Sequence, residues 1–432
     1  MTSPPQDTNP RLAHSFKGVL AIALGAFALV VQEFLPVGLL PDISRDLGVS
    51  EGTAGLAVTA TAVLGAVAAP ITTVLIRGLD RRLALLGLTM LLLVSAILSA
   101  TAEGFLVLVI ARVILGIGVG GFWAISLTAA SRLVPPEKVA KASATVLGGI
   151  SIASVVSVPF GAYVGAHMDW HIAFVASGVL GAAVAGLQAV MLPKIPAEQR
   201  VAASSYTGLL RLSRVRIILT TVILLVAGHY VAYTYINPLL QNVTGFGPGV
   251  VSALLLVYGV VTFLGNFVGG FLAARGVFRA VALTASLFVV SLLVMAVLGT
   301  VGPVAIAALV VWALAWGMAP VTVQLWLFHS ARQAPEAAQA MLSSVIQLAI
   351  GLGSLLGAVT MNMGGVRGAA WTAIAVLAVA GVVVAAVSRR IADPAPRPLA
   401  ETDMQPFASG GGVTADKLAT TAPAECRSDA TL

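Results

Sequence analysis

Twelve apolar stretches, each long enough to cross a membrane, constrain the fold more than any other feature of the sequence. A helix needs about 20 apolar residues to cross a hydrocarbon core of about 30 Å. The stretches are continuously hydrophobic and rich in Ala, Gly, Leu and Val, which favours helices over the alternating strands of a barrel. Only 9% of the residues are charged, far from the roughly 25% of soluble domains. We therefore predict an all-α membrane protein with twelve transmembrane helices, at about 17–40, 53–76, 83–101, 104–131, 143–166, 170–192, 216–240, 250–274, 280–299, 302–329, 340–363 and 369–388.

The basic residues predict the topology. Only Arg45, Arg112 and Arg367 of the 24 Lys and Arg residues fall outside the loops and tails that share the side of the two termini. Because cytoplasmic loops carry the excess of Lys and Arg, this asymmetry predicts that both termini are cytoplasmic. The net charge of +7 is then a topology signal, and no nucleic-acid partner is expected.

The longest polar interruption, at 193–215, divides the spans into six and six. We expect a cytoplasmic N-terminal segment (1–16), a first six-helix lobe (17–192), a cytoplasmic linker (193–215), a second six-helix lobe (216–390) and a disordered cytoplasmic tail (391–432). SRLVPPEK (131–138) and SARQAPEA (330–337) share three residues at an offset of 199, which Gly118 and Gly317 also share. Pseudo-symmetric lobes of this kind hold their substrate between them, near the middle of the membrane.

Glu33 and Arg112 are the only charged residues placed well inside the predicted spans. Both lie about 10–12 Å below the outer surface, taking about 1.5 Å per residue from the helix end, so a direct or water-bridged pair is plausible. Polar groups buried in a membrane are functional candidates. The pair could be a static ion pair, a proton-coupling carboxyl with its partner, or a direct contact to substrate. Pro36 follows Glu33 and predicts a distortion of its helix.

Further polar side chains lie on helical faces at spacings of three and four residues. His229, Tyr233 and Asn237 make one such face, and Arg112 and Trp123 belong to another. Aromatic rings beside amides and hydroxyls suit a flat, mostly neutral polar solute. His229 could also be a packed, hydrogen-bonded histidine or a proton carrier. The predicted substrate-binding residues are Gln32, Trp123, Ser126, His229, Tyr233, Asn237, Gln324 and Gln347.

No enzyme, metal or cofactor is expected. The sequence has no nucleotide-binding loop with Lys and Ser/Thr, no zinc-protease helix and no nucleophile elbow. Cys426 is the only cysteine, which rules out an intrachain disulfide and a cysteine metal site. Transport would then run on an ion gradient.

Several motifs resemble those of the major facilitator superfamily, in particular its drug:proton antiporter-like exporters. ARVILGIGVGG at 111–121 resembles the fourth-span motif, which implies a role in proton movement for Arg112. SVVSVPFGAYVG at 154–165 resembles the fifth-span exporter motif, which implies conformational or packing roles for Pro159, Gly161 and Gly165. RGLDRR at 77–82 matches the loop motif between spans two and three only at its basic end. The resemblance gives Arg81 and Arg82 a conformational role.

Longer strings are similar to the bacterial purine ribonucleoside efflux pumps. They include QEFLPVGLL at 32–40, GGFWAISLT at 120–128 and TYINPLL at 234–240. This resemblance implies the exchange of protons for inosine or guanosine. We expect a monomer in the bacterial inner membrane, with Glu33 and Arg112 as the proton-coupling residues. Asn237 stands where a basic residue is expected. An arabinose-type sugar exporter, a chloramphenicol-type drug exporter, and a channel or sensor remain open as alternatives.

Overall fold

The computed structural model describes residues 15–76, 78–196, 208–330 and 335–390. Most of the predicted N-terminal segment, Arg77, the centre of the predicted linker and the predicted tail lie outside the described residues. Within them the chain is helical and has no strand. The elements are α1 (Phe16–Asp46), α2 (Glu51–Leu75), α3 (Arg81–Ala100), α4 (Phe105–Ser131), η1 (Pro136–Lys138), α5 (Val139–His167), α6 (His171–Met191), α8 (Ser213–Tyr233), α9 (Ile236–Asn242), α10 (Pro248–Arg275), α11 (Val277–Leu298), α12 (Gly302–Ser330) and α13 (Pro335–Arg390).

The prediction of an all-α membrane fold with twelve spans is confirmed. Eleven helices of the described residues are long and apolar enough to cross a membrane, and the last covers Met341–Ala386 within α13. That helix contains a break at Gly365, whose φ of 61° and ψ of −164° are not helical. A positive φ is readily adopted only by glycine. Gly365 therefore divides α13 into the predicted eleventh and twelfth spans.

The predicted seventh span, 216–240, is wrong as a single helix. α8 ends at Tyr233 and α9 starts at Ile236. Pro238 has no N–H to donate to the carbonyl of Thr234 four residues earlier, which weakens the helix at this point. The spacing predicted that Asn237 lies on the same helical face as His229 and Tyr233. Because the helix is interrupted between Tyr233 and Ile236, it does not.

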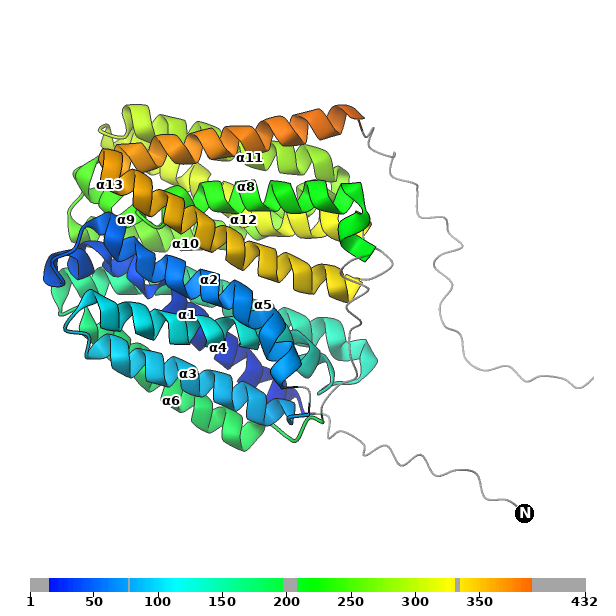
Figure 1. The fold of residues 1–432 in the computed structure, drawn as a ribbon. Helices are drawn as coiled ribbons and strands as arrows, with labels where there is room; N and C mark the ends of the chain where they lie inside the picture. Colours follow the sequence, from blue (N-terminus) through cyan, green and yellow to red (C-terminus); the bar gives the residue numbers. More distant parts are fainter. Residues whose placement is uncertain (1–14, 77, 197–207, 331–334, 391–432) are drawn as a thin grey trace, which may run out of the picture. The chain divides into compact units, whose positions relative to one another are not determined.

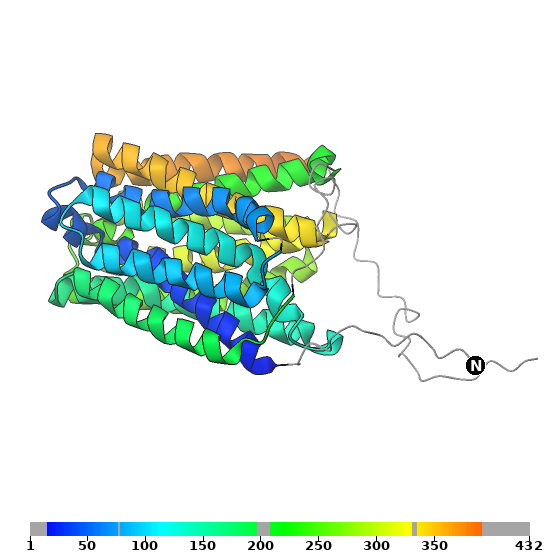
Figure 2. The ribbon, with the colours of Figure 1, turned by 60° about the horizontal axis from the view of Figure 1, so that its bottom comes forward.

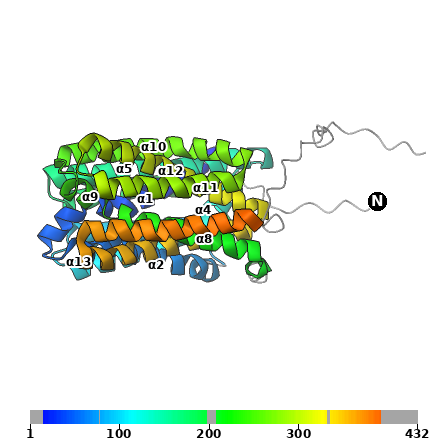
Figure 3. The ribbon, with the colours of Figure 1, turned by 90° about the horizontal axis from the view of Figure 1, so that it is seen from above.

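The helices pack as two sets of six spans. In the first, α1 packs on α5 and α6, α2 on α4, and α3 on α4 and α6; in the second, α13 packs on α8 and α11, and α12 on α10 and α11. Figure 1 shows α1, α3, α4 and α6 in the lower half of the view, and α8, α11 and α12 in the upper half. Figure 2 shows these helices, in the colours of Figure 1, running alongside one another from a second direction, and Figure 3 shows α1, α4, α8, α11 and α12 from a third. The two lobes meet mainly along α2 with α13 and α5 with α10.

The internal repeat has a different register from the one predicted at an offset of 199. The Thr61 hydroxyl donates to the carbonyl of Arg112 (3.2 Å), and the Thr262 hydroxyl donates to that of Ala313 (3.2 Å), 201 residues later in both cases. A Cβ on Gly116 would meet the Thr61 carbonyl, and one on Gly317 would meet the Thr262 carbonyl. The counterpart of Gly317 is therefore Gly116, not Gly118. The counterpart of Arg112 is Ala313, so the second lobe has no charge at this place.

Candidate functional site

Pro36 leaves a backbone carbonyl of α1 available to the Arg112 side chain. α1 continues through Pro36, so the predicted distortion is not a break. Proline has no N–H, so the carbonyl of Gln32, four residues earlier, has no partner within the helix. Nη2 of Arg112 donates to this carbonyl (2.8 Å) and to that of Glu33 (3.0 Å). The guanidinium of α4 is thus tied to the backbone of α1 beside the carboxyl group.

Arg112 is completely buried. Its Nε donates to the hydroxyl of Thr61 in α2 (3.1 Å), so one side chain joins three helices. A hydrogen bond from a charged donor contributes about 1.5–3 kcal/mol. The ion pairs among the described residues are Arg45–Asp42 and His171–Asp169, and Glu33–Arg112 is not one of them. The two charges attract each other without direct contact. Of the two arrangements predicted, the direct pair is therefore absent from this structure, and the water-bridged pair stays a prediction.

The carboxyl group of Glu33 instead contacts the other lobe. Nε2 of Gln347, in α13, donates to Oε1 of Glu33 (3.2 Å). Glu33 is 3% exposed and Gln347 7% exposed, so this bond between the lobes is shielded from solvent. Arg112 and Gln347, two of the predicted residues, therefore meet at Glu33.

The fifth-span motif lets α5 approach α1 closely near Glu33. A Cβ on Gly161 would lie 2.8 Å from the Leu35 carbonyl, and one on Gly165 would lie 2.2 Å from Oδ2 of Asp42. On α1, a Cβ on Gly38 would lie 2.2 Å from the carbonyl of Val158. Gly161 and Gly38 are required for this contact, because a side chain at either would meet the backbone of the other helix, whereas at Gly165 it would meet only the Asp42 and Leu39 side chains.

Pro159 has a separate effect on α5. It leaves the carbonyl of Val155 without an intrahelical donor. Across the lobe boundary, a Cβ on Gly259 of α10 would lie 2.8 Å from that carbonyl. The proline therefore lies one turn from a tight contact between the lobes.

Rings surround His229 on the second-lobe side. His229 stacks on Trp316 (centroids 3.9 Å apart, 4° between planes) and on Tyr233 (4.8 Å, 24°). Nε1 of Trp312 donates to Nδ1 of His229 (3.1 Å). Since Nδ1 accepts, a neutral His229 carries its proton on Nε2, which is buried and has no partner in the described part of the chain. His229 and Tyr233 thus belong to one aromatic cluster.

Phe34 links this cluster to α1. Its ring stacks on that of Tyr230 with centroids 6.1 Å apart and 25° between planes, and Tyr230 packs edge-on against Trp316. Phe34 directly follows Glu33, so the aromatic cluster and the buried carboxyl group are neighbours across the lobe boundary.

Four other predicted residues lie elsewhere. The amide of Gln32 lies 3.2 Å from Oγ of Ser95 in α3, within the first lobe. Trp123 packs among Val30, Val31 and Ala153. Ser126 is buried, and its hydroxyl has no partner among the described residues. Gln324 donates to Oε1 of Gln339 (2.8 Å) and does not bond to Glu33.

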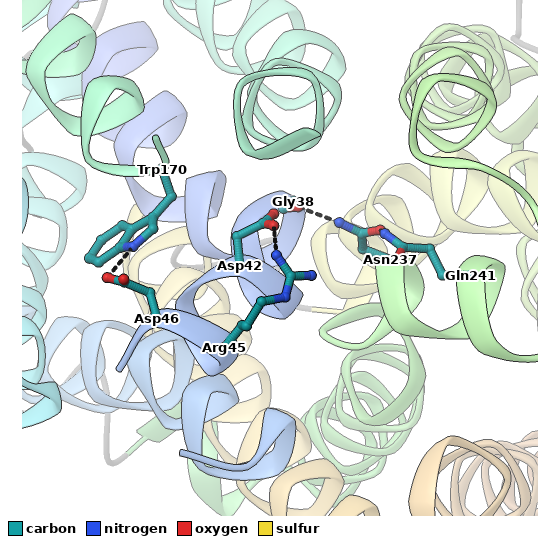
Figure 4. Close-up of polar contacts among 7 residues, drawn as sticks. All are labelled: Gly38, Asp42, Arg45, Asp46, Trp170, Asn237 and Gln241. Carbon is teal, nitrogen blue, oxygen red and sulfur yellow. Dashed lines mark hydrogen bonds and ion pairs between the residues drawn. The ribbon is translucent and has the colours of Figure 1, made fainter. Parts of the chain in front are cut away.

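Asn237 joins the lobes at the predicted outer end, the end formed by residues 47–50, 101–104, 168–170 and 243–247. Its Nδ2 donates to the Gly38 carbonyl, and its Oδ1 accepts from Gln241 (2.7 Å), as Figure 4 shows. The hydroxyl of Tyr235 also donates to the carbonyl of Gly52 (3.3 Å). These bonds hold the lobes together at this end.

Further polar contacts stabilise the same end. Asp42 pairs with Arg45 (3.1 Å), and Asp46 accepts from Nε1 of Trp170 (2.9 Å), both drawn in Figure 4. The Ser50 hydroxyl of the first lobe donates to Oδ1 of Asn362 in the second (2.7 Å). Within the described chain, no three His, Cys, Asp or Glu side chains gather to hold a metal ion.

At the opposite end, the basic loop binds the start of the linker. Asp80 caps α3 and accepts from the N–H groups of Arg82 (2.8 Å) and Ile195 (3.0 Å). Arg81 donates to the Ile76 carbonyl (3.0 Å), and Arg82 donates to the Ala189 carbonyl (2.5 Å). Both arginines thus bond within the first lobe.

Sequence reasoning missed Thr61, Gly38, Tyr230 and Trp312, the residues that orient the predicted ones. Thr61 had a detectable signal, since a hydroxyl in an apolar span usually bonds to a carbonyl or a polar side chain. Gly38 had none, because its role depends on how closely α5 approaches.

Comparison with known proteins agrees with this architecture. The family model of the Major Facilitator Superfamily matches residues 22–341. The purine ribonucleoside efflux pump NepI of Escherichia coli (strain K12) is 33% identical over 348 residues, which cover 81% of this chain and 88% of NepI.

Two solved structures share the fold. A D-xylose-proton symporter has a TM-score of 0.72 at 15% identity, covering 85% of this chain and 97% of the symporter. A mutant of the nucleoside transporter NupG has a TM-score of 0.67 at 13% identity, covering 86% and 98%. On the matched sequence family and this fold, the chain belongs to the major facilitator superfamily and is a multi-pass membrane transporter.

Proposed function

We propose that the protein exports purine ribonucleosides such as inosine and guanosine from the cytoplasm in exchange for protons. It would act as a monomer in the bacterial inner membrane, with both termini cytoplasmic. The observation that carries the proposal is the buried carboxyl group of Glu33, bonded to Gln347 of the other lobe (3.2 Å). The substrate class is supported by the identity of 33% to a purine ribonucleoside efflux pump.

Glu33 can link proton transfer to movement of the lobes. A carboxylate in a buried site keeps its charge only where hydrogen bonds and opposite charges compensate it. The compensation comes from Gln347, on the other lobe, and from the field of Arg112. Because the Gln347 bond breaks when the lobes part, the protonation of Glu33 and the arrangement of the lobes depend on each other. Antiport requires a dependence of this kind.

The aromatic cluster supports a flat solute. Stacking on ring faces is the ordinary mode by which proteins hold nucleobases. His229, Trp316 and Tyr233 present such faces beside Glu33's neighbour Phe34. A purine base could exchange places with these ring contacts when the lobes separate.

Transport by the purified protein in liposomes tests the proposal. Labelled inosine should accumulate against its gradient when a pH gradient is imposed across the membrane. Glu33→Gln should abolish accumulation, since the amide preserves the size of the side chain but cannot lose a proton. Asp42→Asn is the matched control: it removes a carboxylate from the same helix, where Asp42 pairs with the exposed Arg45, and should leave accumulation intact.

The outcomes separate the alternatives. Inosine movement that ignores the pH gradient would contradict antiport, and flux that never saturates would indicate a channel. Competition by arabinose or chloramphenicol, but not by guanosine, would reassign the substrate to a sugar or a drug.

A further inference from the structure

Gln347 has one half of its amide engaged and one half free. Its Nε2 donates to Oε1 of Glu33 (3.2 Å), whereas its Oε1 is buried and has no hydrogen-bond partner in the described chain. An ionised carboxylate can only accept, so the amide nitrogen must face Glu33 and the oxygen must face away. The residue is 7% exposed. A buried acceptor without a partner is uncommon in native structures and requires an explanation.

Arg112 presents the complementary group. Its Nε and Nη2 bond to Thr61, Gln32 and Glu33, whereas Nη1 is buried and has no partner among the residues that the structure describes. Both free atoms belong to side chains held by Glu33, one through its carboxylate and the other through its carbonyl. Two side chains that bond to Glu33 therefore each keep one unpaired atom, an acceptor on Gln347 and a cationic donor on Arg112.

We propose that Gln347 determines substrate specificity by accepting an N–H of the solute at Oε1, while Nη1 of Arg112 donates to a carbonyl of the solute. A 6-oxopurine nucleoside carries the N1–H donor next to the C6 carbonyl, so one edge of the base offers the donor that Gln347 lacks and the acceptor that Arg112 lacks. A 6-aminopurine has an acceptor at N1 and a donor at C6, the reverse pattern. This specificity rests on the proposed function, since it assigns the substrate class to the same site.

The same amide also explains how proton and solute exclude each other. Protonated Glu33 becomes a donor, and Oε1 of Gln347 can accept from it once the amide rotates. The solute N–H and the Glu33 proton then compete for one oxygen. The site holds the solute while Glu33 is ionised and releases it once Glu33 is protonated.

Equilibrium binding to the purified full-length protein at fixed pH tests the specificity. Inosine is compared with purine riboside, which lacks the N1–H and the C6 oxygen but adds no bulk. The wild type should bind inosine at least about tenfold more tightly, because a site built for a donor discriminates against an analogue lacking it. Gln347→Met keeps the length of the side chain and removes the amide. The ratio should therefore fall several-fold and stay above one, because the Arg112 contact to the C6 carbonyl of inosine remains.

Matched variants keep the result interpretable. Gln188→Met removes a buried first-lobe glutamine that bonds to Thr89 and to the Ala21 carbonyl and should keep the wild-type ratio. Gln347→Ala is measured as a second variant, and its binding of purine riboside reports whether the site is folded.

An unchanged ratio in both Gln347 variants would overturn the inference, as would a wild type that binds the two nucleosides equally. These results differ from failure of the proposed function, which is judged by inosine accumulation under a pH gradient. If inosine accumulates but the wild type binds inosine and purine riboside equally, only the role of Gln347 is wrong. If the affinity ratio depends on Gln347 but inosine does not accumulate, only the antiport proposal is wrong.

Discussion

Gly38→Ala tests whether the close contact between α1 and α5 positions Glu33. The new Cβ would lie 2.2 Å from the carbonyl oxygen of Val158 and 2.7 Å from the backbone nitrogen of Ala162. Both atoms belong to the backbone, so no side-chain rotation can relieve the clash. Non-bonded heavy atoms of this kind settle at about 3.5 Å, so α1 and α5 must separate by about 1 Å or distort.

Two opposing effects decide the sign of the change in stability. Replacing Gly by Ala within a helix gains up to about 1 kcal/mol, whereas overpacking a tight contact costs about 1–3 kcal/mol. The net effect at Gly38 is destabilisation by up to about 2 kcal/mol. Gly148→Ala, in α5 itself, is the matched control: no atom lies within 4 Å of its added Cβ, so only the gain applies.

The assay is the apparent melting temperature in detergent, followed by tryptophan fluorescence, together with inosine exchange in liposomes. Gly38→Ala should melt below the wild type, and Gly148→Ala at or above it. Exchange should slow several-fold only in Gly38→Ala, because Gly38 also receives the bond from Asn237 of the other lobe. If Gly38→Ala matches Gly148→Ala in melting and in exchange, the contact is not rigid and the reasoning is wrong.

Three further predictions concern the two ends of the bundle. Asn237→Leu removes a hydrogen bond between the lobes worth about 1 kcal/mol, so it should shift the equilibrium toward opening at the predicted outer end by about fivefold. Spin labels at residues 50 and 362, which are in contact in this structure, should then show an additional population at longer distance. An unchanged distance distribution would contradict the role of Asn237. Asp80→Ala should lower stability by about 1–2 kcal/mol through loss of the α3 cap, and Asp80→Asn, which can still accept, should lose less; equal melting temperatures would exclude capping. The backbone N–H and the ring of His171 donate to Asp169 and hold its pKa below its ordinary value of 3.8, so its small stabilising contribution is present above about pH 4 and is lost as the pH falls further. Asp169→Asn should therefore melt slightly below the wild type at pH 7, and the difference should shrink as the pH is lowered below 4; a difference that does not change with pH would refute this.

The sequence predicted the spans and the two interior charges because both are properties of short segments. An apolar run of about 20 residues has few alternatives to a membrane helix, and a charged residue inside such a run is visible without any knowledge of its neighbours. The matched depth of Glu33 and Arg112 also follows from counting along two helices. That count placed them in one layer but could not reveal which atoms bond.

Three aspects of the site could not be read from the sequence. The partner of the Glu33 carboxylate is Gln347, 314 residues away on the other lobe. Arg112 bonds to carbonyls because Pro36 frees that of Gln32, an effect that needs the two helices side by side. The register of the repeat, which pairs Gly116 with Gly317, appears only in how α2 packs on α4 and α10 on α12.

By itself, the sequence determined that the chain crosses a membrane twelve times and keeps an acid and a base within it, because local hydrophobicity and the cost of burying charge decide both. The tertiary structure decided that the acid faces an amide of the other lobe and that the base binds the α1 backbone. Those contacts depend on distances between helices that lie far apart in the chain. Glycines contribute to these distances, because without a Cβ they let the helix backbones pack closely. The segment around Glu33, residues 30–41, therefore shows its charge in the sequence and its partners only in the fold.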